Sequence, residues 1–191
     1  MIPSDEEIKV GVFGLNNESA PGPDGFGASF YHTYWEIIKK DVIVVVLEFF
    51  HTGWLLPNYN ANSLILIPKN PNGDTVDQYK SIALANFKFK IISKVIADRL
   101  ANILPKHHIC GIKGRNIKDC IALTSEAINI LDKKSYVGNL ALKIDVSKAF
   151  DTINWDFLLK VLKCFGFNLT FCNWISFILQ SACVSVCING S

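Results

Sequence analysis

The segment NLALKIDV at residues 139–146 constrains the fold most. Its side chains alternate in the pattern of a β-strand, and a carboxylate lies near its C-terminal end. Its apolar side chains occupy every second position: Leu140, Leu142, Ile144 and Val146. On a pleated strand this spacing places Lys143 and Asp145 together on the opposite face. We therefore expect a strand whose C-terminal end presents the Asp145 carboxylate.

Two interpretations of Asp145 follow from its position. A carboxylate at a strand end suits Mg²⁺, which is bound by one or two carboxylates together with substrate phosphates and water. The plainer alternative is a polar residue that ends the strand, and spacing alone favours it. Asp151 and Asn154 each suit the N-cap of the helix that follows, so Asp151 is expected to be structural. Phe150 by itself indicates a core side chain.

The composition indicates a packed globular chain. Half of the 191 residues are hydrophobic and 19% are charged, which argues against disorder. A formal net charge of +2 is too small to indicate a nucleic-acid partner, so such binding requires basic residues gathered on one face. The opening MIPSDEEIKV is acidic and polar, which favours an intracellular protein over a secreted one. The apolar run at 42–50 is too short to span a membrane and predicts a buried helix.

The cysteines indicate neither a zinc site nor a disulfide framework. None of the six forms a CxxC pair, which is the spacing common in structural zinc sites. In an intracellular protein the expected state is reduced, and these thiols are predicted to be mostly buried.

Periodicity and turn residues predict the other elements. Residues 1–19 are weakly patterned and are expected to be irregular, and APGPDGFG at 20–27 indicates a turn. Apolar spacings of three and four predict five helices, at 31–52, 87–104, 118–132, 154–165 and 170–181. Short apolar runs predict strands at 61–69 and 183–188, the second of them unpaired at the end of the chain. Helices dominate over a few strands, so the fold class is α+β or mixed α/β.

The most basic surface of the chain is expected on the helix at 87–104. Its basic residues are Lys88, Lys90, Lys94 and Arg99, and Arg115 follows in the next segment. They are candidates for phosphate contacts with a nucleic acid. A solvated helix face explains them almost equally well.

Six stretches, taken in sequence order, resemble one family. They read SAPGPDGF, YWEIIKKDV, LPNYNANSLILIPK, DQYKSIALANFKFKIISKVIADRL, GRNIKDC and NLALKIDVSKAFDTINW. Together they are similar to the reverse transcriptase domain of plant LINE-type (non-LTR) retrotransposons, and the resemblance runs from about residue 18 to Ser191. It makes the metal-binding interpretation of Asp145 the favoured one.

The resemblance implies part of a right-hand polymerase. Residues 20–191 form an incomplete reverse transcriptase domain, with the fingers at about 20–135 and the start of the palm at about 136–191. A small antiparallel sheet is expected, and the chain reaches Ser191 before the catalytic hairpin of the family. The implied partners are an RNA template, a DNA primer, a deoxynucleoside triphosphate and the remainder of the polymerase chain. The complete element is expected in the nucleus.

The resemblance also implies roles for palm residues. Asp145 matches the catalytic aspartate that binds the two Mg²⁺ ions of the family. The main-chain groups of Val146 and Ser147 are expected beside the incoming triphosphate. Phe150 matches the bulky residue that packs under the sugar and excludes a 2′-hydroxyl.

In the fingers, Lys69 and Lys80 match positions that bind the triphosphate. Family members usually read Tyr-Arg-Pro-Ile where this chain reads Tyr79-Lys80-Ser81-Ile82. A lysine keeps the positive charge but lacks the planar fork with which arginine binds phosphate in two hydrogen bonds. The segment at 104–116 is also shorter than its counterpart in the family.

The family's Ala-Asp-Asp motif, which supplies further metal-binding carboxylates, does not occur in these 191 residues. Because one carboxylate cannot hold two dications in place, this chain by itself is expected to be inactive. The alternative function is that of a non-catalytic remnant that binds nucleic acid.

Overall fold

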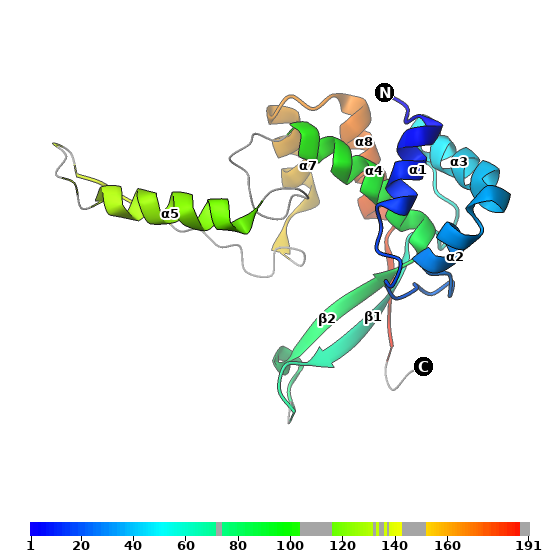
Figure 1. Ribbon diagram of the computed structural model, residues 1–191, viewed down its shortest axis with the longest axis horizontal. Coiled ribbons are helices and arrows are strands. Elements are labelled where there is room, and N and C mark those ends of the chain that lie inside the picture. Colours follow the sequence, from blue (N-terminus) through cyan, green and yellow to red (C-terminus); the bar gives the residue numbers. More distant parts are fainter. Residues whose placement is uncertain are drawn as a thin grey trace. The chain divides into compact units, whose positions relative to one another are not determined.

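The structure, a computed structural model, describes residues 1–71, 74–103, 116–131, 133, 136, 138–142 and 152–187. The chain divides into two compact units. Unit 1 comprises Met1–Ile96 and Asn154–Ser191, and unit 2 comprises Ala97–Ile153. The described residues contain seven α-helices and one three-stranded sheet (Figure 1). The helix-rich α+β class is therefore confirmed, whereas the division into fingers and palm at 135/136 stays a prediction.

Helix α1 (Asp5–Phe13) occupies a segment that was expected to be irregular. The Ser4 hydroxyl caps it by accepting a hydrogen bond from the Glu7 N–H at 3.2 Å. Ile8 and Val12, one turn apart, are both fully buried. The expectation was wrong for these residues because one local cap and two apolar side chains suffice when tertiary packing stabilises the helix.

The helix predicted from Tyr31 to about residue 52 is two helices, α2 (Ala28–Thr33) and α3 (Trp35–Thr52). They meet at Tyr34, whose φ of −98° and ψ of 13° interrupt the helical path. Helix α3 ends at Gly53, which has a left-handed φ of 75°. Among the described residues, no helix is long and apolar enough to cross a membrane.

Helix α4 (Phe87–Ile103) confirms the helix predicted at 87–104. Together with α1, α2, α3 and α8 (Leu169–Ser181), it supplies the apolar core of unit 1. The largest fully buried side chains are Phe49, Phe50, Phe87, Ile8, Ile91, Ile92, Val12, Val46 and Val95. All of them lie in unit 1.

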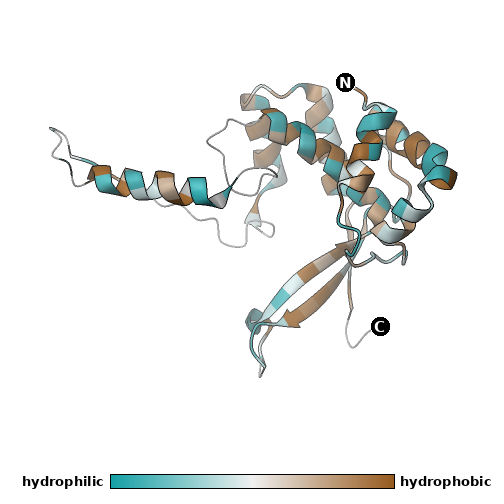
Figure 2. Cartoon of the chain, in the orientation of Figure 1, coloured by the Kyte–Doolittle hydropathy of each residue, from teal (hydrophilic) through white to brown (hydrophobic). Residues whose placement is uncertain are grey.

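The sheet has the strand order β2-β1-β3. Its strands are β1 (Ala61–Pro68), β2 (Tyr79–Ala85) and β3 (Cys183–Val186), and a short 3₁₀ helix, η1 (Val76–Gln78), precedes β2. Strand β1 is antiparallel to β2 and parallel to β3. The sheet is therefore mixed rather than wholly antiparallel, and the terminal strand is paired, contrary to expectation. Strand β1 is hydrophobic along most of its length (Figure 2).

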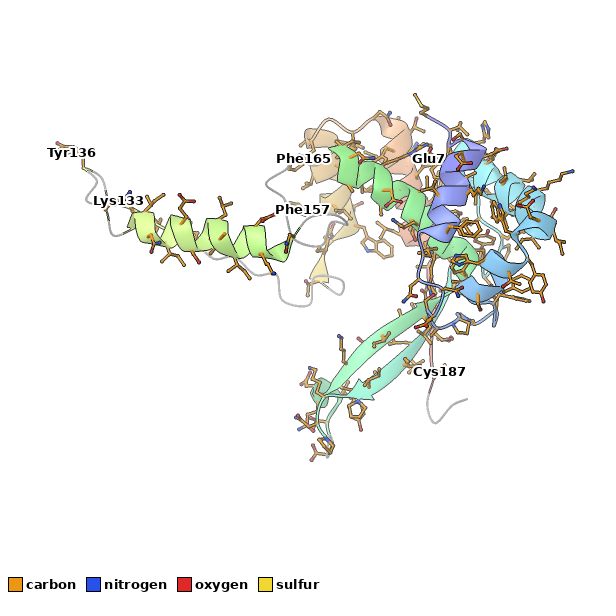
Figure 3. All side chains as sticks on the ribbon, in the orientation of Figure 1. Glu7, Lys133, Tyr136, Phe157, Phe165 and Cys187 are labelled. Atoms are coloured by element: carbon orange, nitrogen blue, oxygen red, sulfur yellow. The ribbon has the colours of Figure 1, made fainter. Side chains whose placement is uncertain are left out.

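Helices α7 (Trp155–Cys164) and α8 pack against each other in unit 1. They confirm the helices predicted at 154–165 and 170–181. The side chains of Asn154 and Asn168 cap them, accepting hydrogen bonds from the N–H groups of Phe157 and Phe171. The Trp174 indole N–H donates to the buried Phe50 carbonyl at 3.2 Å, which ties α8 to the end of α3. Figure 3 shows Phe157 on α7, Phe165 just after the end of α7 and Cys187 just after β3.

In unit 2, helix α5 (Ile117–Leu131) confirms the helix predicted at 118–132. The strand predicted at 139–146 is not found in its described part, because residues 138–142 carry no strand and Leu140 and Leu142 are exposed. A strand requires a hydrogen-bonded partner, and alternation of side chains does not specify one. Residues 143–146 lie outside the described part of the chain.

Among the side chains that the structure describes, four cysteines have free thiols: Cys164, Cys172, Cys183 and Cys187. Cys172 is buried, whereas Cys164 and Cys183 are exposed. The prediction of mostly buried thiols was wrong for these two, because they lie at the end of α7 and in an exposed strand.

Candidate functional site

The hairpin formed by β1 and β2 brings two predicted site residues onto one face. Ile67 is paired with Lys80, and the Lys69 N–H donates to the Gln78 carbonyl at 2.7 Å. Directly opposed residues of an antiparallel pair share a face, and successive residues of a strand alternate between faces. Lys69 and Lys80 are therefore diagonal neighbours on the same face at the far end of the hairpin.

Both of these lysines are exposed. The Lys69 ammonium donates to the Asp77 main-chain carbonyl at 2.8 Å, which restrains its position. Diagonal neighbours on a sheet lie roughly 7 Å apart, so two ammonium groups on flexible stems can bind different phosphates of one polyphosphate. The two ammonium groups act as a pair of point charges, and their spacing suits a triphosphate.

Lys88 and Lys90, predicted to contact nucleic acid, have partners within the protein. The Lys88 ammonium lies 3.5 Å from Asp24 Oδ2 and 5.2 Å from the centre of the Tyr59 ring. The Lys90 ammonium donates to the Ala20 carbonyl at 3.2 Å. Burial lowers the pKa of Lys90, and the nearby Asp24 charge opposes that shift. Both lysines therefore hold the loop at 20–27, and their role in nucleic-acid binding stays a prediction.

The other basic candidates are spread over the chain. Lys94 is half-buried, and its stem lies 3.4 Å from where a Cβ on Gly14 would be, so it packs at the end of α1. Arg99 belongs to unit 2, and Arg115 lies outside the described residues. Their predicted contacts with phosphates remain untested predictions.

The predicted palm site lies outside the described residues. This applies to Asp145, Val146, Ser147 and Phe150, and also to Asp151. Within the described ranges, no three His, Cys, Asp or Glu side chains gather closely enough to hold a metal ion.

Asp24 lies in the turn predicted at 20–27, and no role was predicted for its side chain. Its Oδ1 accepts from the Phe26 N–H at 3.2 Å, and its Oδ2 is buried beside Lys88. Burial, and secondarily the Asp24 charge, raises the pKa of Tyr31 to about 12. Burial, followed by Tyr31 and Asp24, also raises the pKa of Tyr59. The sequence signal for its role was an acidic residue inside a Pro- and Gly-rich loop. The lysines that contact this loop, Lys88 and Lys90, follow Asp24 by 64 and 66 positions.

Comparisons with known proteins give a consistent result. Residues 67–190 match the family described as reverse transcriptase (RNA-dependent DNA polymerase). A Xenopus laevis protein named "Transposon TX1 uncharacterized 149 kDa protein" is 24% identical over 190 residues. That alignment covers 97% of this chain but 14% of the length of the frog protein. Because the family match spans more than half of its residues, this chain belongs to the reverse transcriptase family.

Proposed function

We propose that this chain contributes the fingers and the first part of the palm of an RNA-directed DNA polymerase from a LINE-type (non-LTR) retrotransposon of plants. The family match at 67–190, the similarity to a transposon protein along 97% of the chain and the six resembling stretches support this function. Its partners are an RNA template, a DNA primer and a deoxynucleoside triphosphate. The complete element acts in the nucleus.

The observation that carries the proposal is the lysine pair at the end of the β1–β2 hairpin. Lys69 and Lys80 share one face there. In the proposed function they neutralise the triphosphate of the incoming nucleotide. Lysine binds phosphate as a compact charge rather than through a planar fork. This site therefore recognises the negative charge of the triphosphate more than the orientation of its phosphate groups.

The resemblance assigns the chemistry to the segment after residue 142. Asp145 is the proposed catalytic carboxylate and metal ligand, and Val146 and Ser147 offer main-chain groups to the triphosphate. Phe150 is the proposed sugar gate, because a flat ring under the sugar overlaps one extra oxygen and so rejects a ribonucleotide.

In a two-metal site, Mg²⁺ would supply stabilisation of the charge on the attacking and the leaving oxygen. Asp145 has suitable chemistry for one such ion, but a single carboxylate cannot position two. These 191 residues contain no Ala-Asp-Asp motif, and their described part holds no cluster of metal ligands. A polypeptide of these residues alone is therefore proposed not to extend a primer.

Primer extension on an RNA template tests the proposal in the full-length polymerase chain. Asp145→Asn should abolish extension, and Lys80→Ala should raise the KM for the nucleotide about tenfold or more, as expected when a charged contact is lost. Lys160→Ala, an exposed lysine on α7, is the matched control and should leave the KM unchanged. Normal extension by the Asp145→Asn variant would refute the catalytic assignment.

The polypeptide of residues 1–191 provides a second test. It should give no extension, and detectable extension that is lost in Asp145→Asn would contradict its proposed inactivity.

A non-catalytic nucleic-acid-binding protein is the second candidate, favoured by the exposed lysine pair together with the single candidate metal ligand. In that case the polypeptide binds RNA without extending a primer. Its affinity should fall steeply with salt, because phosphate contacts release counterions. Affinity that does not change with salt would exclude this candidate.

A further inference from the structure

The two strands of the hairpin join the helices of unit 1 at one junction, the hairpin root, formed by residues 58–61 and 85–87. Asn86 is buried there, with 3% of its surface exposed. Its main-chain N–H donates to the Ala61 carbonyl at 3.3 Å, and its side-chain amide donates to the Asn58 carbonyl at 3.0 Å. One asparagine therefore joins the start of β1 to the end of β2.

The loop at 20–27 is fastened to this root. The Asp24 N–H donates to Asn86 Oδ1 at 3.0 Å. Gly22 lies so close to the peptide between Ala85 and Asn86 that a Cβ there would overlap its atoms. The loop thus contacts the backbone on which β2 ends and also binds the side chain that links the two strands.

Two lysines of α4 also hold the loop at 20–27. Lys88 and Lys90 lie in the first turn of α4, which begins directly after the root. Lys88 approaches the Asp24 carboxylate, and Lys90 donates to the Ala20 carbonyl. Asp24 Oδ2 is buried and has no hydrogen-bond partner among the described residues. The Lys88 ammonium is therefore its main compensation, and a neutral side chain at residue 24 would lose that attraction.

Because the hairpin is long, a small rotation at the root produces a large displacement of the lysine pair. The strands extend away from the helices of unit 1 (Figure 1). Lys80 precedes Ala85 by five residues, which corresponds to about 17 Å at roughly 3.4 Å per residue. A rotation of about 10° at the root would move Lys80 by about 3 Å, and a displacement of about 1 Å already impairs a positioned contact.

We propose that the loop at 20–27 is a positioning element for nucleotide binding, with Asp24 and Gly22 as positioning residues that set the direction of the hairpin. Neither residue touches the nucleotide; both act through the root on Lys80. The proposal rests on the proposed function, in which Lys69 and Lys80 bind the triphosphate. It gives the Pro- and Gly-rich loop a role in substrate affinity that its sequence alone does not suggest.

A double-mutant cycle in the full-length polymerase tests this role. Asp24→Asn should raise the KM for the nucleotide about tenfold and leave kcat within about twofold, because ground-state positioning is lost while the chemistry is intact. In the Lys80→Ala background, Asp24→Asn should have little further effect, since residues that act through one contact are not additive. Asp41→Asn, an exposed aspartate on α3, is the control and should change neither value.

The outcomes separate the two proposals. If Lys80→Ala leaves the KM unchanged, the nucleotide-binding role of the hairpin fails, and this inference fails with it. If Lys80→Ala raises the KM but Asp24→Asn does not, or if their effects multiply, only the positioning role is overturned. If Asp24→Asn does not fold, Lys88→Gln removes the same ion pair from a side chain that is 34% exposed. That variant should reproduce the rise in KM, and an unchanged KM would overturn the positioning role.

Discussion

Gly53 and Gly166 each have a left-handed backbone, with φ of 75° and 86°, but their surroundings differ. A Cβ on Gly53 would overlap the Phe177 ring, whereas a Cβ on Gly166 would meet nothing within 4 Å. An L-residue in this conformation costs about 1 kcal/mol, and forced overlap in a packed region costs about 1–3 kcal/mol more. We expect Gly53→Ala to lower the free energy of unfolding by about 2–4 kcal/mol.

Gly166→Ala is the matched control for this prediction and should cost about 1 kcal/mol. Urea unfolding of both variants measures the difference. Equal losses would mean that the approach of Phe177 to Gly53 contributes nothing, so that backbone conformation alone requires glycine at the end of α3.

Tyr31 links stability to pH in the alkaline range. Its hydroxyl has a pKa of about 12 in the folded chain, raised from 10.0 mainly by burial. The folded state therefore keeps a proton that the unfolded state loses first. The resulting stabilisation is complete below pH 10 and is lost as the pH rises from 10 to 12.

Tyr31→Phe should flatten the fall of the unfolding free energy across this range, as measured by urea unfolding at about pH 9 and about pH 11.5. The same variant should lose one late transition in an ultraviolet titration of the tyrosines. If the unfolding free energy of the variant falls equally steeply with pH, groups other than Tyr31 cause the alkaline destabilisation.

At the scale of elements, α1 depends on a cap that is visible in the sequence. Ser4 and Glu7 have the spacing of a capping box, and the Ser4 hydroxyl accepts from the Glu7 N–H. Ser4→Ala should lower the free energy of unfolding by about 1 kcal/mol. Ser4→Asn should restore most of it, because asparagine is an equally good cap. Circular dichroism during urea unfolding measures both, and a loss of the same size in Ser4→Asn would rule out capping as the cause.

The sequence predicts the long elements better than their ends and partners. Helices α4, α5, α7 and α8 follow from apolar spacing, because each carries apolar side chains at intervals of three and four residues. The break at Tyr34 was not predicted, since apolar spacing continues across it from α2 into α3. Strand β2 was not predicted either, because it is defined by its pairing with β1 rather than by alternation within Tyr79–Ala85.

The candidate site was predictable to a similar degree. The resemblance identified Lys69 and Lys80 separately, and the register of β1 and β2 was needed to place them on one face. Asp24 could not be assigned from local pattern, because its partners Asn86 and Lys88 are more than 60 residues away in the chain. The contacts that fix the hairpin root are non-local, and periodicity carries no information about them.

At the scale of the whole molecule, apolar burial within the described residues is concentrated in unit 1. Ile92 on α4 is fully buried there. Hydrophobic and polar residues alternate along α5 (Figure 2), and its apolar side chains are about half exposed: Ile121, Leu123, Ile128 and Ile130. A helix of this length gains most of its stability from packing rather than from propensity. We therefore expect the two units to respond differently to the loss of one apolar side chain.

Two matched substitutions test this expectation. Ile92→Ala removes a fully buried side chain and should lower the free energy of unfolding of unit 1 by about 2–5 kcal/mol. Ile128→Ala, in unit 2, removes a side chain that is 56% exposed. This substitution should change the free energy of unfolding by at most about 0.5 kcal/mol. Hydrogen exchange resolved by segment measures both effects, because slowly exchanging core amides report the global unfolding free energy. Comparable losses in the two variants would mean that α5 buries Ile128 against another part of the chain, and that unit 2 shares the cooperative unfolding of unit 1.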